Sequence, residues 1–87
     1  MEYIDIVLTL DGFFCVAPPW TVKEGDLICL PDALSGAPKI HDVISVATDS
    51  KDGEHIAMIE KYVGYPLPKA TAKYLKSEVV WDEYVQE

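Results

Sequence analysis

The sequence predicts a single, small, mainly β domain that forms a barrel or a half-open sheet and carries one short helix. Short runs of β-branched and aromatic residues recur along the chain, separated by turn residues such as Asp11-Gly12 and Pro18-Pro19. In segment 22–30, a polar turn ending in Gly25-Asp26 opens onto an apolar run, which is typical of the start of a barrel strand. With 87 residues, 49% of them hydrophobic, the chain can form one core and is too short for a second domain.

The first two predicted strands form a hairpin. Residues 3–10 are rich in β-branched and aromatic side chains and are followed by Asp11-Gly12, a strong signal for a two-residue hairpin turn. The return strand at residues 13–17 ends at Pro18-Pro19, because proline cannot donate a hydrogen bond to a ladder.

The next two strands are separated by a loop. The third predicted strand, residues 27–30, ends at Pro31, and residues 32–39 contain the glycine and proline of a surface loop. The fourth strand, residues 40–48, alternates in polarity and stops at the polar turn 49–53.

Residues 54–63 fit both the spacing of a helix and the alternation of a strand, and we favour a helix. Ser50 or Asp52 can cap its start, Glu54 suits its first turn, and Gly64 suits the position just after its last turn.

The chain after this helix is predicted to be extended. The two prolines in residues 65–68 bias the residues before them away from helical angles. Residues 69–75 alternate as a closing strand would, although one or two turns of helix also fit. The tail, residues 77–87, fits a last strand, a short docked helix, or an aromatic and acidic segment used by a partner.

Taken together, the hairpin 3–17, the Val-Lys-Glu-Gly-Asp turn at 22–26 and the strands at 27–31 and 43–47 resemble the small SH3-like β-barrels. That group includes modules of phage and mobile-element proteins and the front domain of the primosomal helicase. The resemblance implies a five-stranded barrel or half-open sheet. It also implies a binding role toward peptides, nucleic acids or a host protein.

The charge of the chain indicates which partners to expect. The formal net charge is −8, and all seven basic residues are lysines. Guanidinium is the preferred group for bidentate contacts to phosphate and guanine, and a net negative charge repels nucleic acids and anionic membranes. We therefore expect a protein partner, with nucleic acid disfavoured and no membrane binding.

We expect no catalytic, metal or cofactor site. Cys15 and Cys29 each lie in an apolar run, as reduced core thiols do. A zinc site that combined them with His41 and His55 would lack the short ligand pairs of structural zinc. No motif positions a nucleophile or an acid–base pair, so the sequence predicts a non-enzymatic protein. The acidic N-terminus and the absence of an apolar run of about 20 residues indicate a cytoplasmic location.

The leading functional hypothesis is a protein-interaction module that binds through exposed aromatic side chains, for which we expect Trp20, Tyr65, Trp81 and Tyr84. Alternatively, Trp20 closes one end of the barrel and Trp81 packs the tail.

Three further hypotheses stay open. The acidic surface could imitate nucleic acid and block a host enzyme that binds nucleic acid. A basic patch of Lys69, Lys73 and Lys76 would instead suit weak binding of a single strand. An exposed edge strand would also allow two copies of the chain to pair as a homodimer.

Overall fold

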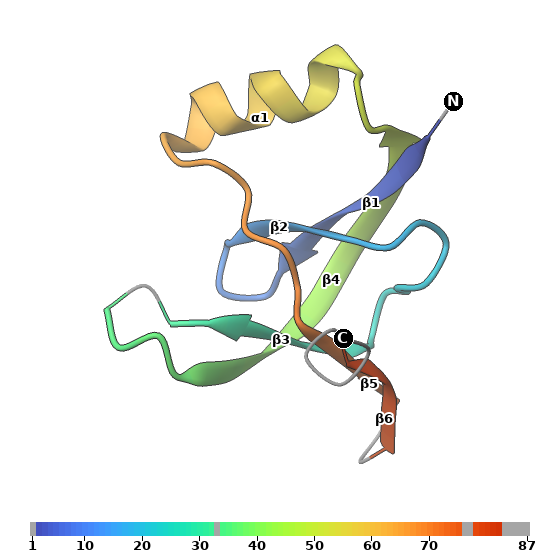
Figure 1. Ribbon diagram of the computed structural model, residues 1–87, viewed down its shortest axis with the longest axis vertical. Coiled ribbons are helices and arrows are strands. Elements are labelled where there is room, and N and C mark those ends of the chain that lie inside the picture. The colour runs from blue at the N-terminus through green and yellow to red at the C-terminus, as the bar shows by residue number, and fades with distance from the viewer. Residues whose placement is uncertain (1, 33, 76–77, 83–87) are drawn as a thin grey trace.

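The computed structural model describes residues 2–32, 34–75 and 78–82 of the chain. In this part of the chain, the strands form one antiparallel sheet of six, in the order β2-β1-β4-β3-β5-β6, with a single helix beside it (Figure 1). The predicted mainly β architecture with one short helix is confirmed. The elements are β1 (Tyr3–Thr9), β2 (Phe14–Ala17), β3 (Leu27–Pro31), β4 (Pro38–Ser50), α1 (Glu54–Val63), β5 (Ala72–Leu75) and β6 (Glu78–Asp82).

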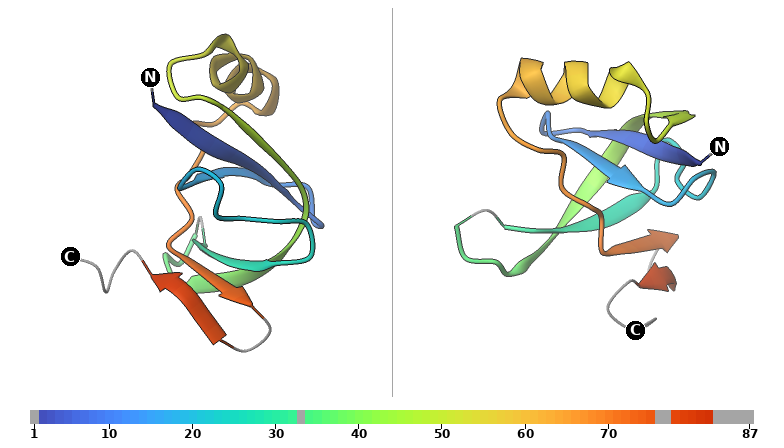
Figure 2. Two further views of the ribbon diagram at one scale, coloured as in Figure 1. Left: turned by 90° about the vertical axis from the view of Figure 1, so that its right-hand side faces the viewer. Right: turned by 45° about the horizontal axis from the view of Figure 1, so that its top comes forward.

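Strand β4 is the longest and joins the two halves of the sheet. Its C-terminal half pairs with β1, where Ile6 lies opposite Ala47, and its N-terminal half pairs with β3, where Ile28 lies opposite His41. The register shifts between Leu8 and Thr9, as at a β-bulge. Bulges bend a strand and increase its twist, so this one helps β4 to pass from one half to the other, as Figure 2 shows.

The two ends of the sheet approach each other through the segment before β5. The Val16 amide donates to the Pro68 carbonyl oxygen at 2.9 Å, and the Ala70 amide donates to the Val16 carbonyl oxygen at 2.8 Å. These bonds form an isolated parallel bridge between Val16 and Lys69. A single bridge, and not a ladder, joins β2 to the chain that leads into β5. In the described residues the sheet is therefore unclosed.

The core lies inside the curved sheet. Its buried members come from β1, β2, β3 and β4, and from the segments before β3 and β5; they are Val7, Cys15, Ala17, Val22, Ile28, Leu30, Val43 and Ala70. Both cysteines are buried and free, as predicted. Burial raises the pKa of the Cys15 thiol to about 12, which keeps it protonated and unreactive at neutral pH.

The strand boundaries differ from the prediction at the hairpin loop and at both ends of β4, which runs to Ser50 where the predicted strand stops at residue 48. The hairpin loop has three residues, 10–12, because the Thr9 amide donates to the Phe13 carbonyl oxygen and Gly12 takes a φ of 90°. Strand β4 begins at Pro38, where the sequence predicts Ile40, because Pro38 lies opposite Pro31 at the end of the β3–β4 ladder. Proline is tolerated there because little further pairing is lost.

Helix α1 has the predicted bounds and the predicted C-terminal glycine. Gly64 has a φ of 84°, and its amide donates to the Glu60 carbonyl oxygen at 2.8 Å. The prediction that Ser50 or Asp52 caps the start is wrong. Gly53 is the N-cap and no side chain caps the helix, because Ser50 still belongs to β4, paired with Tyr3.

The C-terminal part agrees with the prediction in outline. Residues 65–68 are outside helices and strands, while the predicted closing strand 69–75 is shorter and begins at Ala72. The predicted tail contains β6, which pairs with β5; residues 83–87 lie outside the described residues. No helix in the described ranges is long and apolar enough to cross a membrane.

Candidate interaction surface

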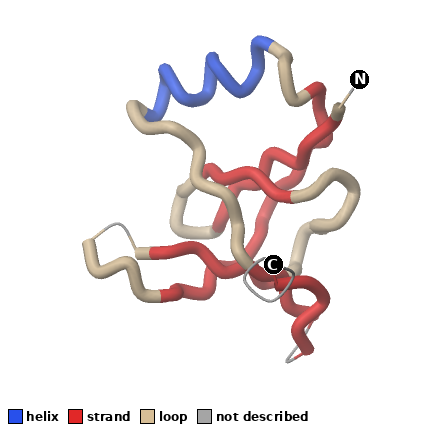
Figure 3. The backbone as a smooth tube through the Cα atoms, in the orientation of Figure 1, coloured by secondary structure: helices blue, strands red, loops and turns tan. Residues whose placement is uncertain are grey.

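The loop between β2 and β3 is held by a buried carboxylate. Asp5 on β1 has no solvent exposure. Its Oδ1 accepts a hydrogen bond from the Trp20 amide at 2.9 Å, and its Oδ2 accepts from the Thr21 and Val22 amides at 3.0 and 3.1 Å. The Thr48 hydroxyl donates to Oδ1 from β4. Three successive amides of one loop therefore converge on one side chain. Figure 3 shows this loop in tan, directly after β2.

This loop presents Trp20 to solvent. The side chain of Trp20 is 70% exposed, and its backbone φ is 59°, a left-handed conformation that no other described non-glycine residue adopts. The ring lies against Tyr3, with ring centroids 5.2 Å apart and the planes tilted by 50°. The alternative in which Trp20 closes one end of the barrel is therefore wrong.

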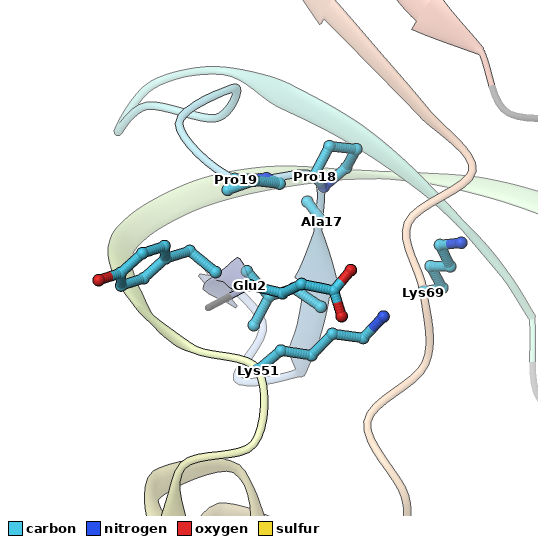
Figure 4. A pocket seen from close by; sticks show the side chains of 8 residues that line it. Glu2, Ala17, Pro18, Pro19, Lys51 and Lys69 are labelled. Carbon is cyan, nitrogen blue, oxygen red and sulfur yellow. The ribbon is translucent and has the colours of Figure 1, made fainter.

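A hollow adjoins these rings. It has a volume of about 380 Å³ and is lined by Tyr3, Ile4, Ala17, Pro18 and Pro19, with the charged side chains of Glu2, Lys51 and Lys69 around it (Figure 4). We call Tyr3, Trp20 and this hollow the Trp20 surface. It combines a large exposed ring with a concave apolar wall, which is the composition of protein-binding surfaces.

A second buried carboxylate supports the other end of the loop. The Asp26 Oδ2 accepts a hydrogen bond from the Lys23 amide at 2.8 Å and lies 3.7 Å from the Lys73 Nζ. The same Nζ donates to the Thr21 carbonyl oxygen. The Lys73 side chain is only 13% exposed, so it is part of the internal support of the Trp20 loop.

This arrangement changes the interpretation of the predicted basic patch. Lys73 points inward, Lys69 lines the hollow beside Pro18, and Lys76 lies outside the described residues. The two described members of this patch, Lys69 and Lys73, therefore do not form one solvent-facing group.

Of the other predicted aromatic side chains, the structure describes only Tyr65, which does not line the hollow of the Trp20 surface. Tyr65 is partly buried, and its hydroxyl oxygen accepts a hydrogen bond from the Phe14 amide at 3.2 Å. Phe14 begins β2 and Trp20 follows its end, so Tyr65 and Trp20 lie near opposite ends of that strand. The Trp81 backbone pairs with Lys73, but its side chain lies outside the description, as does all of Tyr84.

Sequence reasoning missed Tyr3 and Asp5. A usable signal was present, because Asp5 stands between Ile4 and Ile6 in a strand that is otherwise apolar. A carboxylate that is buried must accept hydrogen bonds, so an acidic residue at such a position indicates that backbone donors from elsewhere converge on it. The sequence does not reveal which donors these are.

A separate polar cluster fixes the hairpin loop to β4. The Nδ1 of buried His41 lies 3.0 and 3.1 Å from the two carboxylate oxygens of Asp11. The Thr9 hydroxyl donates to Asp11 at 2.7 Å and accepts from the Phe13 amide at 3.0 Å. The Thr9 hydroxyl, and then His41, lower the pKa of Asp11. Together these contacts cross-link the hairpin loop to β4, which is a structural role.

Comparison with protein-family models, with curated protein sequences and with solved structures found no match to this chain. In the ranges that the structure describes, no three His, Cys, Asp or Glu side chains are grouped so that they could hold a metal ion.

Proposed function

We propose that the protein is a non-enzymatic interaction module of the small SH3-like barrel type, and that it binds a protein partner through the Trp20 surface. One observation carries the proposal: a tryptophan that is 70% exposed is held in a left-handed backbone conformation by a fully buried carboxylate.

The energetics of the loop support this proposal. A left-handed conformation costs a non-glycine residue about 1–2 kcal/mol, and surrounding contacts must compensate for it. The bonds from Asp5 to the amides of residues 20–22 provide that compensation. They fix a large ring in solvent, where it contributes little to the core. Tryptophan is one of the residue types enriched among the few positions that supply most of the binding energy at protein interfaces.

Two further observations favour a protein over a polyanion as the partner. The chain has a net charge of −8, which repels nucleic acid. Lys73, part of the predicted basic patch, is paired with Asp26 beneath the loop.

The proposal is tested by capture of a partner with tagged protein at low and high salt, identification of the captured protein, and titration of the two purified proteins by calorimetry. The test variant is Trp20→Ala. The matched control is Tyr62→Ala, because Tyr62 is an exposed aromatic residue on α1, 88% exposed and away from the hollow. Circular dichroism verifies that both variants fold.

We expect Trp20→Ala to weaken binding at least about tenfold, and Tyr62→Ala to leave it unchanged. Binding through an aromatic anchor persists at high salt. If Trp20→Ala binds as well as the unaltered protein, the proposal is wrong. Capture of a nucleic-acid enzyme that is lost at high salt and unaffected by Trp20→Ala would instead favour the acidic mimic.

A further inference from the structure

The space between α1 and the sheet is a second concave site, on a different face from the Trp20 surface. Helix α1 spans the outer face of β1 and β2 (Figure 2, right), yet none of its residues is buried. Between helix and sheet lies a cavity of about 290 Å³ that is open to solvent on one side. It is lined by residues of β1, β2, β4 and α1: Ile6, Leu8, Phe14, Ser45, Ala47, Asp49, His55 and Ile59.

Polar contacts fix both ends of the helix, while no residue of the helix is buried against the sheet. At the N-terminal end, the His55 Nδ1 pairs with the Asp49 carboxylate of β4. At the C-terminal end, Glu60 accepts a hydrogen bond from the Leu67 amide at 2.8 Å, and the Tyr65 hydroxyl accepts from the Phe14 amide. Because both ends of the helix are held in place, the cavity between helix and sheet is part of the folded structure.

The walls of the cavity define a ligand chemistry. The side chains of Ile6, Leu8, Phe14 and Ile59 supply apolar surface from both layers, while Ser45, Asp49 and His55 supply the polar groups. At about 30 Å³ for each water-sized group, the volume corresponds to roughly ten non-hydrogen atoms. Pockets that bind small molecules begin at about this size.

We propose that this cavity binds a small neutral molecule with an apolar body and one hydrogen-bonding group, of the size of indole or of an eight-carbon alcohol. A carboxylate ligand is disfavoured, because it would lie near the Asp49 carboxylate in a protein of net charge −8. A cationic ligand is disfavoured because most of the lining is apolar and would remove water from its charge, and the one carboxylate present, Asp49, already accepts hydrogen bonds from the Ser50 amide and from His55. The ring of Phe14 favours an aromatic ligand such as indole.

The experiment is a titration of the isotope-labelled full chain with indole and with 1-octanol, followed by NMR. Octanoate, which has the same chain length and a negative charge, is the matched probe. Two variants separate the cavity from the rest of the surface. Ala47→Leu places a larger side chain in the cavity, and Ala57→Leu makes the same change at an exposed helix position outside the lining.

We expect saturable shifts at Ile6, Leu8, Phe14 and Ile59 with indole and octanol, and binding of octanoate at least about tenfold weaker. Ala47→Leu should weaken indole binding at least about tenfold, and Ala57→Leu should leave it within about twofold. If Ala47→Leu fails to fold by circular dichroism, Ser45→Leu fills the same cavity from another exposed sheet position.

Three results would overturn the proposal: no saturable shifts, shifts centred on Tyr3 and Trp20, or equal loss of binding in the cavity-filling variant and in Ala57→Leu. The outcome does not depend on the proposed protein-binding role. Trp20→Ala leaves the cavity unchanged and should bind indole normally, so failure of one proposal is distinguishable from failure of the other.

Discussion

Asp5 shows how one buried side chain sets the conformation of a distant loop. It accepts hydrogen bonds from three consecutive amides and from the Thr48 hydroxyl. Asp5→Ala leaves the three amides without an acceptor, so we expect a loss of at least about 3 kcal/mol in the free energy of unfolding. Urea titration followed by tryptophan fluorescence measures the change.

The matched control for Asp5→Ala is Thr48→Val, which removes one donor to the same carboxylate and keeps the amides bonded. It should cost about 1 kcal/mol. Equal losses in the two variants would contradict the role assigned to the three amides.

The cluster around His41 leads to a prediction about pH. The Thr9 hydroxyl is the main cause of the lowered pKa of Asp11, and His41 contributes. A carboxyl group whose pKa is lower in the folded state stabilises the fold above its unfolded pKa of about 4, and this stabilisation is lost as pH falls through the folded pKa. Thr9→Val removes the main cause, so its unfolding free energy should fall less steeply than that of the unaltered protein between about pH 5 and pH 2.

Urea unfolding at a series of pH values tests this expectation. Thr71→Val is the control, because the Thr71 hydroxyl donates to the backbone carbonyl of Cys29 and, among the described residues, bonds no carboxylate. It should lower stability equally at every pH. An identical pH slope in the Thr9 variant and the unaltered protein would show that the hydroxyl does not influence Asp11.

At the scale of elements, the end of helix α1 depends on backbone conformation at one position. Gly64 has a φ of 84°, and a Cβ placed there would meet no atom within 4 Å. Substitution therefore introduces backbone strain without a steric clash. Gly64→Ala should lower the free energy of unfolding by about 1 kcal/mol, and Gly64→Asn by less, because asparagine tolerates the left-handed region. Thermal unfolding compares the two, and equal stability of the alanine variant and the unaltered protein would contradict the assignment.

The elements that could be predicted from the sequence are those with local signals. The bounds of α1 follow from a charged first turn and a terminal glycine, both encoded within the segment. The hairpin was predicted for the same reason, although its loop is one residue longer than predicted because Thr9 pairs with Phe13. The cap at Ser50 was predicted wrongly, because pairing with Tyr3 keeps that residue in β4. A local sequence pattern cannot show that a residue distant in the chain, here Tyr3, will pair with the predicted cap.

The candidate site was predictable only in part, for the same physical reason. The exposure of Trp20 fits the expectation of a surface aromatic residue. The inward orientation of Lys73 depends on Asp26 and on the Thr21 carbonyl, which lie about fifty residues earlier in the chain. Burial of a lysine beside a carboxylate is a tertiary property, so a run of spaced lysines could not reveal it.

For the molecule as a whole, the arrangement of the sheet predicts two levels of local stability. Strand β1 is paired on both sides, and the Val16–Lys69 bridge, which includes the bond from the Ala70 amide, ties the last strands to β2 beside the core. Helix α1 is anchored at its ends and has no buried residue. Amides of β1 and the Ala70 amide should therefore exchange with solvent only through global unfolding, while amides of α1 should exchange through a local opening of lower free energy. Native-state hydrogen exchange by NMR, with low concentrations of denaturant, measures both. If the Ala70 amide exchanges at the lower free energy of α1 while β1 stays protected, the bridge lies outside the cooperative core, and β5 and β6 can separate from the rest of the sheet without unfolding it.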